Sequence, residues 1–207
     1  SDLVDECARL NVDNGATLNL FARRLREAGR LSQKGRGRGA AHMTYLDAAR
    51  FLIACGATDH PERAVEAEAA FSGALLFENN LLPRLFDVEK GARFDDVLAS
   101  LLQLIAEGEI DRRNAEQYRE RGFTIAPVLD VRIGRGGGSA YIRALEATLS
   151  FFHPTMILAM KSADYFEAKP YWAGWETDTL RFRTGKNLSA EFDGRILRPI
   201  ANLIAGQ

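Results

Sequence analysis

The residues with the clearest chemistry in this 207-residue chain form a run of cations that passes from a candidate helix into a glycine-rich segment. Between Leu20 and Tyr45 there are seven Lys or Arg residues and one acid, Glu27, which gives a net charge of +6. The whole chain carries −1, so the remaining residues sum to −7. A local concentration of positive charge is typical of nucleic-acid contacts. The candidate nucleic-acid-binding residues are therefore Arg23, Arg26, Arg30, Lys34, Arg36 and Arg38.

The first half of this run has the pattern of an amphipathic helix over residues 16–28. Its apolar stripe recurs every three or four residues, and Gly29 follows as a suitable C-cap. Arg23, Arg26 and Arg30 are expected on the opposite side. Arginine binds guanine edges bidentately and pairs with phosphates, so this side of the helix is suited to a DNA groove.

The second half of the run has glycine at alternate positions, Gly35, Gly37 and Gly39. Its flanks, RLSQ and AAHMT, are short enough to form two strands with a mobile tip between them. Glycine neighbours leave room for Arg36 and Arg38 to reach phosphates, and Lys34 adds a third cation. We expect this loop to contact the nucleic-acid backbone.

The order of these elements is a helix over 2–10, a turn, the basic helix, a hairpin-like segment and a further helix from Thr44. This order, and the stretch LARRLREAGRLSQKGRGRG in particular, resembles the core of winged-helix DNA-binding regulators over about the first 58 residues. The resemblance implies a recognition helix in the major groove and a hairpin tip on the backbone or minor groove. It also implies double-stranded DNA as partner, transcriptional regulation as function, and a homodimer on paired half-sites.

The basic run is open to other interpretations. It has one sign and lacks the i,i+4 acid–base pairing of ordinary solvated helices, which favours a polyanion contact. The alternative function is that of a phage-like assembly or packaging protein. In that case this patch would bind an acidic partner, or would bind nucleic acid non-specifically. Neither glycine cluster matches a Walker loop or a GxGxxG fingerprint, which argues against nucleotide binding.

The remaining residues give little indication of catalysis or metal binding. The three histidines are scattered, no serine lies in a nucleophile-elbow motif, and Asp95 with Asp96 suits the start of a helix. We therefore expect no enzyme, cofactor or metal. Cys7 and Cys55 are expected to be buried thiols in a reducing compartment. No apolar run approaches the ~20 residues of a membrane span, and the acidic start is no signal peptide, so a cytoplasmic protein without membrane contact is expected.

An aromatic cluster in the last quarter of the chain is the other unusual feature. It lies in the stretch YFEAKPYWAGWE, where proline and glycine suggest a loop. Such a cluster can line a ligand pocket or a partner interface. Because aromatic residues dominate cores, covering of a C-terminal sheet is the favoured interpretation. The residues are Tyr165, Phe166, Tyr171, Trp172 and Trp175.

The elements that must position these residues predict an α+β protein. We expect a winged-helix-like region over 1–78 and an α+β region for self-association or ligand sensing over 79–207. The apolar helix 95–106 is either a dimer element or a central core helix. In the first half we also expect a capping box at Thr44 and Asp47, and then a helix that exposes its acids and runs to about residue 77. A polar helix or connector is expected over 111–122, a strand after Gly122, and a strand or a helix over 140–152. The chain should end with a hairpin around 184–187 and a closing helix over 194–205.

Overall fold

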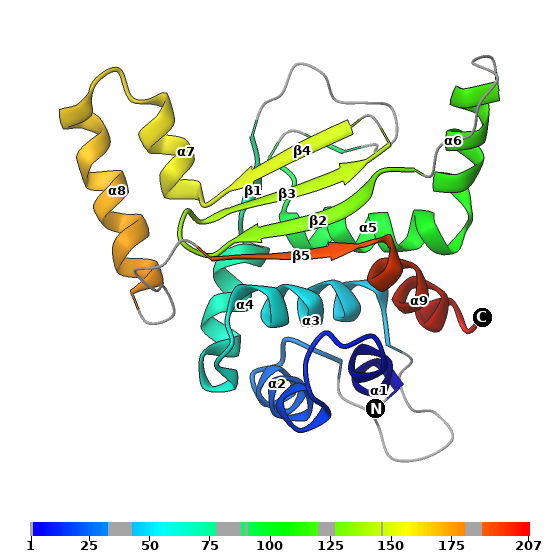
Figure 1. The fold of residues 1–207 in the computed structure, drawn as a ribbon. Helices are drawn as coiled ribbons and strands as arrows, with labels where there is room; N and C mark the ends of the chain where they lie inside the picture. The colour runs from blue at the N-terminus through cyan, green and yellow to red at the C-terminus, as the bar shows by residue number, and fades with distance from the viewer. Residues whose placement is uncertain are drawn as a thin grey trace.

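The computed structural model describes residues 2–32, 43–77, 88–89, 91–119, 127–145, 147–180 and 188–207. Helices dominate the N-terminal half, and one antiparallel sheet is built almost entirely from the C-terminal half (Figure 1). The predicted α+β class is therefore confirmed. The helices are α1 (Asp2–Arg9), α2 (Gly15–Glu27), α3 (Tyr45–Ala57), α4 (Ala64–Ser72, after a 3-10 turn at Pro61–Arg63), α5 (Phe94–Ala106), α6 (Glu109–Arg119), α7 (Pro154–Lys161), α8 (Tyr165–Thr179) and α9 (Gly194–Ala205).

The sheet has the strand order β1-β4-β3-β2-β5, with all neighbours antiparallel. Its register sets Val131 opposite both Ile142 and Phe192. Because side chains alternate along a strand, these apolar residues share the inner face, and the residues between them face outward. The strands are β1 (Leu75–Leu76), β2 (Leu129–Gly134), β3 (Ser139–Ala144), β4 (Ala147–Phe152) and β5 (Ser189–Asp193). The stretch 140–152, which the sequence left open, thus forms two strands.

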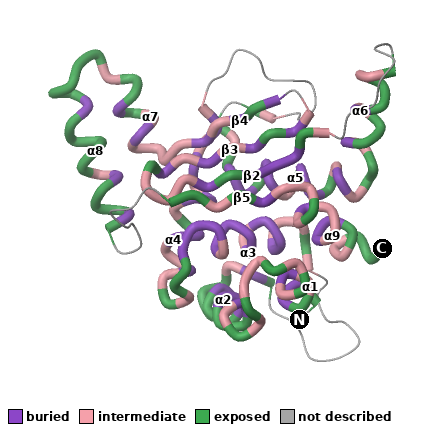
Figure 2. The backbone as a smooth tube through the Cα atoms, viewed as in Figure 1, coloured by how far each residue is buried: buried purple, intermediate pink, exposed green. Residues whose placement is uncertain are grey.

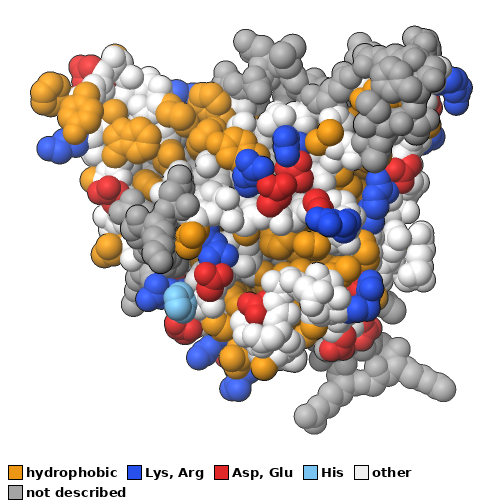
Figure 3. All heavy atoms as spheres, viewed as in Figure 1, with side chains coloured by type: hydrophobic (Ala, Val, Ile, Leu, Met, Phe, Trp, Pro, Cys, Tyr) orange, Lys and Arg blue, Asp and Glu red, His pale blue; other side chains and the backbone are white. Residues whose placement is uncertain are grey.

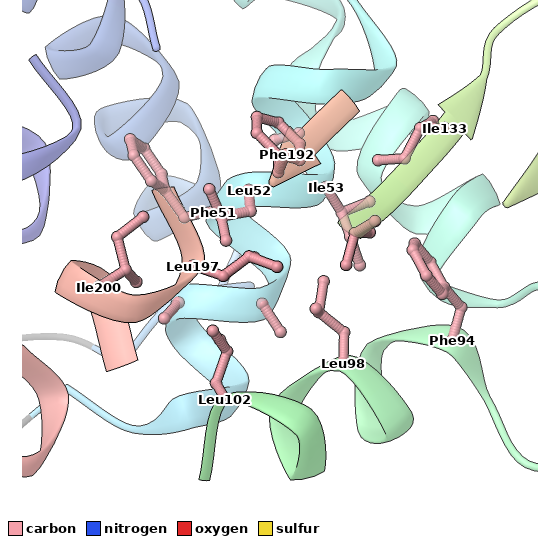
Figure 4. Close-up of a cluster of buried hydrophobic side chains, with 14 of the residues drawn as sticks. Phe51, Leu52, Ile53, Phe94, Leu98, Leu102, Ile133, Phe192, Leu197 and Ile200 are labelled. Atoms are coloured by element: carbon pink, nitrogen blue, oxygen red, sulfur yellow. The ribbon is translucent and has the colours of Figure 1, made fainter. Parts of the chain in front are cut away.

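The inner face of the sheet packs on a helical layer in which α3 is central. Helix α3 is buried on almost all sides, because α5 and α9 contact it next to the sheet and α1 and α2 lie beyond it (Figures 1 and 2). Figure 4 shows Phe51 and Leu52 of α3 beside Leu98 of α5 and Leu197 of α9. The sequence allowed two roles for the helix over 95–106, a dimer element or a core helix. The structure shows that this helix, α5, is a core helix.

One cluster of buried side chains extends from Leu3 to Ala201. It draws on α1 to α4 as well as on the sheet and α9, so the predicted boundary at residue 78 does not separate two cores. Strand β1 crosses that boundary too, since Leu75 pairs with Phe152 of β4. Among the described residues, no helix is long and apolar enough to cross a membrane.

Several helix ends follow from local chemistry that the sequence displays. Thr44 and Asp47 form the predicted capping box at the start of α3. After α2, Gly29 adopts a φ of +68°, and the Arg30 amide donates to the carbonyl of Leu25 at 2.8 Å. This left-handed turn closes the helix as Gly29 predicts. Helix α9 has the predicted bounds.

The stretch that holds the aromatic cluster is a helix, not a loop. Asp164 caps α8 by accepting a hydrogen bond from the Glu167 amide at 2.9 Å, and Pro170 lies inside the helix. Of the five aromatic residues only Trp175 is buried, so the expectation that the cluster covers the core of the sheet is wrong for the other four. The Trp175 ring packs on His153, with ring centroids 5.1 Å apart, and on Gly138. Burial lowers the pKa of His153.

We expect Gly138→Ala to displace Trp175 and loosen α8 from the sheet. A Cβ at Gly138 would lie 2.2 Å from the Trp175 ring, and the φ of +59° adds backbone strain, so a cost of about 1–2 kcal/mol follows. Hydrogen exchange of the α8 amides is the measurement. Gly137→Ala is the matched control, since a Cβ there meets nothing closer than 3.8 Å. Equal exchange rates in the two variants would contradict the contact.

Candidate nucleic-acid interface

The exposed side of α2 carries two adjacent cations. Leu18, Phe21, Ala22 and Leu25 are buried, which turns the opposite side of the helix to solvent. Arg23 and Arg24 are exposed there, and Arg26 is half-buried at the edge of that side. Arg24 is thus a surface cation that the predicted set left out, although its position opposite the apolar stripe could have identified it.

An acid within the same helix offsets part of this charge. The Arg23 Nε donates to Glu27 Oε1 at 2.7 Å, and an Arg24 Nη1 lies 3.8 Å from Glu27 Oε2. The hydrogen bond from Arg23 lowers the pKa of Glu27. The expectation that the run lacks i,i+4 acid–base pairing is therefore wrong. Glu27 stands four residues after Arg23, so the pair could have been found in the sequence.

Arg30 does not lie on the exposed side of this helix. The helix ends at Glu27, and the left-handed turn at Gly29 directs Arg30 toward α4. There its Nε and Nη2 donate to the two carboxylate oxygens of Glu68 at 2.6 and 2.9 Å. The Glu68 side chain is fully buried and also accepts from the Ser72 hydroxyl. The prediction that Arg30 shares a groove-facing side with Arg23 and Arg26 is wrong, because a bidentate buried pair holds its guanidinium.

The buried ion pairs continue beneath Arg30. The Arg50 Nε lies 3.0 Å from Asp95 Oδ2 and 3.9 Å from Glu68 Oε1, so this guanidinium connects the two buried acids. Arg93 donates to the same Asp95 at 3.2 Å. Glu68 is therefore not on an exposed acidic face as predicted. Asp95 does more than complement a helix dipole, because it receives two guanidinium groups.

Asp47 holds together the two ends of the chain segment that carries the other predicted cations. Its Oδ1 accepts a hydrogen bond from the Ser32 amide at 2.7 Å. Its Oδ2 accepts from the Thr44 amide and from the Thr44 hydroxyl, both at 2.9 Å. Burial tends to raise the pKa of Asp47, but these hydrogen bonds outweigh it and the pKa is lowered. The residues that flank positions 33–42, here called the basic segment, are therefore held at one carboxylate.

The basic segment contains Lys34, Arg36 and Arg38 and no acid. These three predicted residues, and the predicted hairpin that would present them, lie outside the described residues. The structure thus brings together the two attachment points of the basic segment, α2, and the buried pair of Arg30 with Glu68.

The open face of the sheet differs from this region, because its cations are paired with acids on neighbouring strands. Arg132 of β2 contacts Glu191 of β5 at 2.5 Å, and Arg143 of β3 contacts Asp130 of β2 at 2.7 Å. Figure 3 shows acidic and basic side chains intermixed over these strands. This face therefore offers mixed charge.

Chemistry based on thiols or metals has little support in the described part of the chain. Cys7 and Cys55 are both free, and burial raises the pKa of the Cys7 thiol to about 12, which keeps it protonated. The described residues contain no group of three acids, histidines or cysteines placed to hold a metal ion.

Comparison with known proteins adds no functional assignment to this geometry. No protein-family model matches the chain, and no curated protein or solved structure shows significant similarity to it.

Proposed function

We propose that this protein binds double-stranded DNA, with the basic segment and the exposed side of α2 on the phosphate backbone. The observation that carries the proposal is the attachment of the basic segment at both ends by Asp47. In the sequence, the three cations of this acid-free segment therefore lie between two residues that one carboxylate holds. Chain length alone keeps each of their Cα atoms within roughly 20 Å of Ser32 or Thr44, because six extended residues span about that distance.

A tethered group of cations is favourable for binding a polyanion. DNA carries one negative charge per ~1.7 Å of helix axis, so several phosphates lie within reach of such a segment at once. Holding the ends together also lowers the conformational entropy that the segment loses on binding. In this proposal Lys34, Arg36 and Arg38 contact phosphates, and Arg23, Arg24 and Arg26 contact the duplex from α2. Arg30 keeps its place at Glu68 and fixes the chain before the basic segment begins.

Transcriptional regulation is the finer proposal, and it requires that α2 reads base edges as well as phosphates. The alternative is an assembly protein in which the same surface binds an acidic protein. One observation favours that alternative: Leu20 is half exposed on the side of α2 that carries Arg23 and Arg24. An apolar side chain among cations suits a protein partner better than a phosphate backbone.

The DNA-binding proposal predicts a large effect from the triple variant Lys34→Ala/Arg36→Ala/Arg38→Ala. If each cation releases one counterion, the slope of log K against log salt should fall by about 2.7, since each phosphate contact contributes about 0.9. Fluorescence anisotropy with a labelled random duplex, measured over a salt series, gives this slope.

The control removes three cations elsewhere, Arg112→Ala/Arg132→Ala/Arg195→Ala, and so changes the net charge equally. These arginines are exposed on α6, β2 and α9, and each pairs with acids nearby. The control should keep the parental slope. Equal slopes in parent, triple variant and control would refute the proposal. If the parent protein prefers a selected sequence over random duplex, a transcriptional regulator is supported. If it shows no such preference but its affinity still depends on salt, non-specific binding by an assembly protein is supported.

A further inference from the structure

Exposed apolar side chains concentrate on α7, α8 and the residue that follows α8. Ten large apolar residues in the described part of the chain are well exposed, and seven of them lie between residues 158 and 180. Figure 3 shows the hydrophobic side chains gathered over these helices at the upper left. A contiguous apolar surface of this kind marks an interaction site.

Helix α8 attaches to the protein by one side only. Ala168, Trp175 and Thr179 are its buried residues, and they lie within about 40° of one another at 100° per residue. Beside them runs a second stripe, about 120° wide, which faces solvent or is half exposed. This outer stripe consists of Tyr165, Phe166, Lys169, Trp172, Ala173, Glu176 and Leu180.

We propose that the outer stripe is the interface of a symmetric homodimer, in which α8 packs antiparallel on α8 of a second copy. The two-fold axis would pass near Trp172 and Ala173. A two-fold interface must be self-complementary, and this stripe is. Lys169 lies about one turn before the axis and Glu176 about one turn after it, so each Lys169 faces Glu176 of the second copy. The small side chain of Ala173 allows close approach at the centre.

The charge of α8 argues for a protein partner over a nucleic acid or an anionic membrane. Asp164, Glu167, Glu176 and Asp178 outnumber Lys169 on the helix and its cap, so phosphates would be repelled. The aromatic side chains of the stripe have total surfaces of ~150–250 Å² each. With 68%, 83% and 37% of Tyr165, Phe166 and Trp172 exposed, these three residues offer roughly 300–500 Å² together. Leu180 and the polar rim would supply the rest of the ~800 Å² that each partner contributes to a stable interface.

This proposal does not rest on DNA binding, because no residue of the outer stripe lies in α2 or in the basic segment. It does replace the expectation that the helix over 95–106 could join two copies, since α5 is buried in the core.

The first experiment compares Trp172→Ala with Tyr171→Ala by sedimentation velocity of the full chain over a wide concentration range. The two aromatic residues are adjacent and equally exposed, at 37%, but only Trp172 lies on the outer stripe. Trp172→Ala should weaken dimerisation by at least tenfold, as expected for a central aromatic residue. Tyr171→Ala should stay within about threefold of the parent. A parent that remains monomeric at the highest concentration, or equal effects of the two variants, would overturn the proposal.

The second experiment tests the register through charge. Lys169→Glu alone and Glu176→Lys alone each create two like-charged contacts in the proposed dimer and should weaken it by about tenfold. The double variant Lys169→Glu/Glu176→Lys restores opposite charges and should recover to within about threefold of the parent. An equimolar mixture of the two single variants should likewise form heterodimers, because each supplies the charge that the other lacks. Failure of both rescues, in variants whose circular dichroism matches the parent, would exclude this antiparallel pairing.

Discussion

Glu68→Ala is expected to destabilise the protein by about 3–5 kcal/mol, a large part of the stability of an ordinary domain. The Glu68 side chain is fully buried and neutralises Arg30, whose Nε lies 2.6 Å away. Its removal leaves a partly buried guanidinium without that acid, and leaves the Ser72 hydroxyl without an acceptor. Chemical denaturation followed by far-ultraviolet circular dichroism measures the change.

Two further variants separate the ion pair from the loss of a side chain in general. Glu62→Ala removes an exposed acid just before α4 and should change the free energy of unfolding by no more than about 0.5 kcal/mol. Arg30→Met/Glu68→Leu replaces both charges by apolar groups, and should recover most of the loss because an apolar pair avoids the desolvation of two ions. A cost for Glu68→Ala no greater than that for Glu62→Ala would show that the pair does not stabilise the fold.

The parts of the fold that the sequence predicted well are those determined by local interactions. The capping box at Thr44 and Asp47 lies within four residues, and Gly29 ends α2 through its own backbone. The bounds of α9 follow from the Asp193 cap, whose side chain accepts a hydrogen bond from the Arg195 amide, and from a left-handed Gly206 at its end. Such signals depend on neighbours in the sequence, so a pattern of residue types is enough to find them.

The parts that could not be predicted depend on contacts between distant residues. Arg30 and Glu68 are 38 positions apart, and Arg50 and Asp95 are 45 positions apart. Charge counting alone assigns Arg30 to the surface because it carries no information about which acid the fold places beside it. The sequence of α8 suggests a loop because Pro170 and Gly174 lower helix propensity, whereas the Asp164 cap and the packing of Trp175 favour the helix.

Asp47→Ala is the second large effect, with an expected loss of about 3 kcal/mol. The carboxylate accepts hydrogen bonds from the Ser32 amide, the Thr44 amide and the Thr44 hydroxyl, so its removal takes away the capping box and leaves two backbone donors without their acceptor. Asp47→Asn should lose somewhat less, because one amide oxygen can still accept a hydrogen bond but the amide nitrogen cannot. Denaturation of the three proteins at neutral pH gives these differences.

The pH dependence of Asp47→Asn has a definite sign. The folded-state pKa of Asp47 is lowered, so its carboxylate contributes stability above the unfolded value of about 3.9, and that contribution is lost as the pH falls through the folded-state pKa. The stability gap between parent and Asp47→Asn should therefore be widest near neutrality and narrow below about pH 4. A gap that stays constant over this range would show that the Asp47 charge contributes nothing.

Asp47→Asn also connects stability with the proposed DNA contact. If attachment at both ends is what presents the basic segment, loosening one end should weaken DNA binding about three- to tenfold at a temperature where the variant is fully folded, because more chain entropy is lost on binding. Glu62→Ala, far less damaging to stability, should leave DNA affinity unchanged. If Asp47→Asn retains parental affinity while Lys34→Ala/Arg36→Ala/Arg38→Ala loses it, the cations bind DNA without help from their attachment. Asp47 would then serve the fold alone.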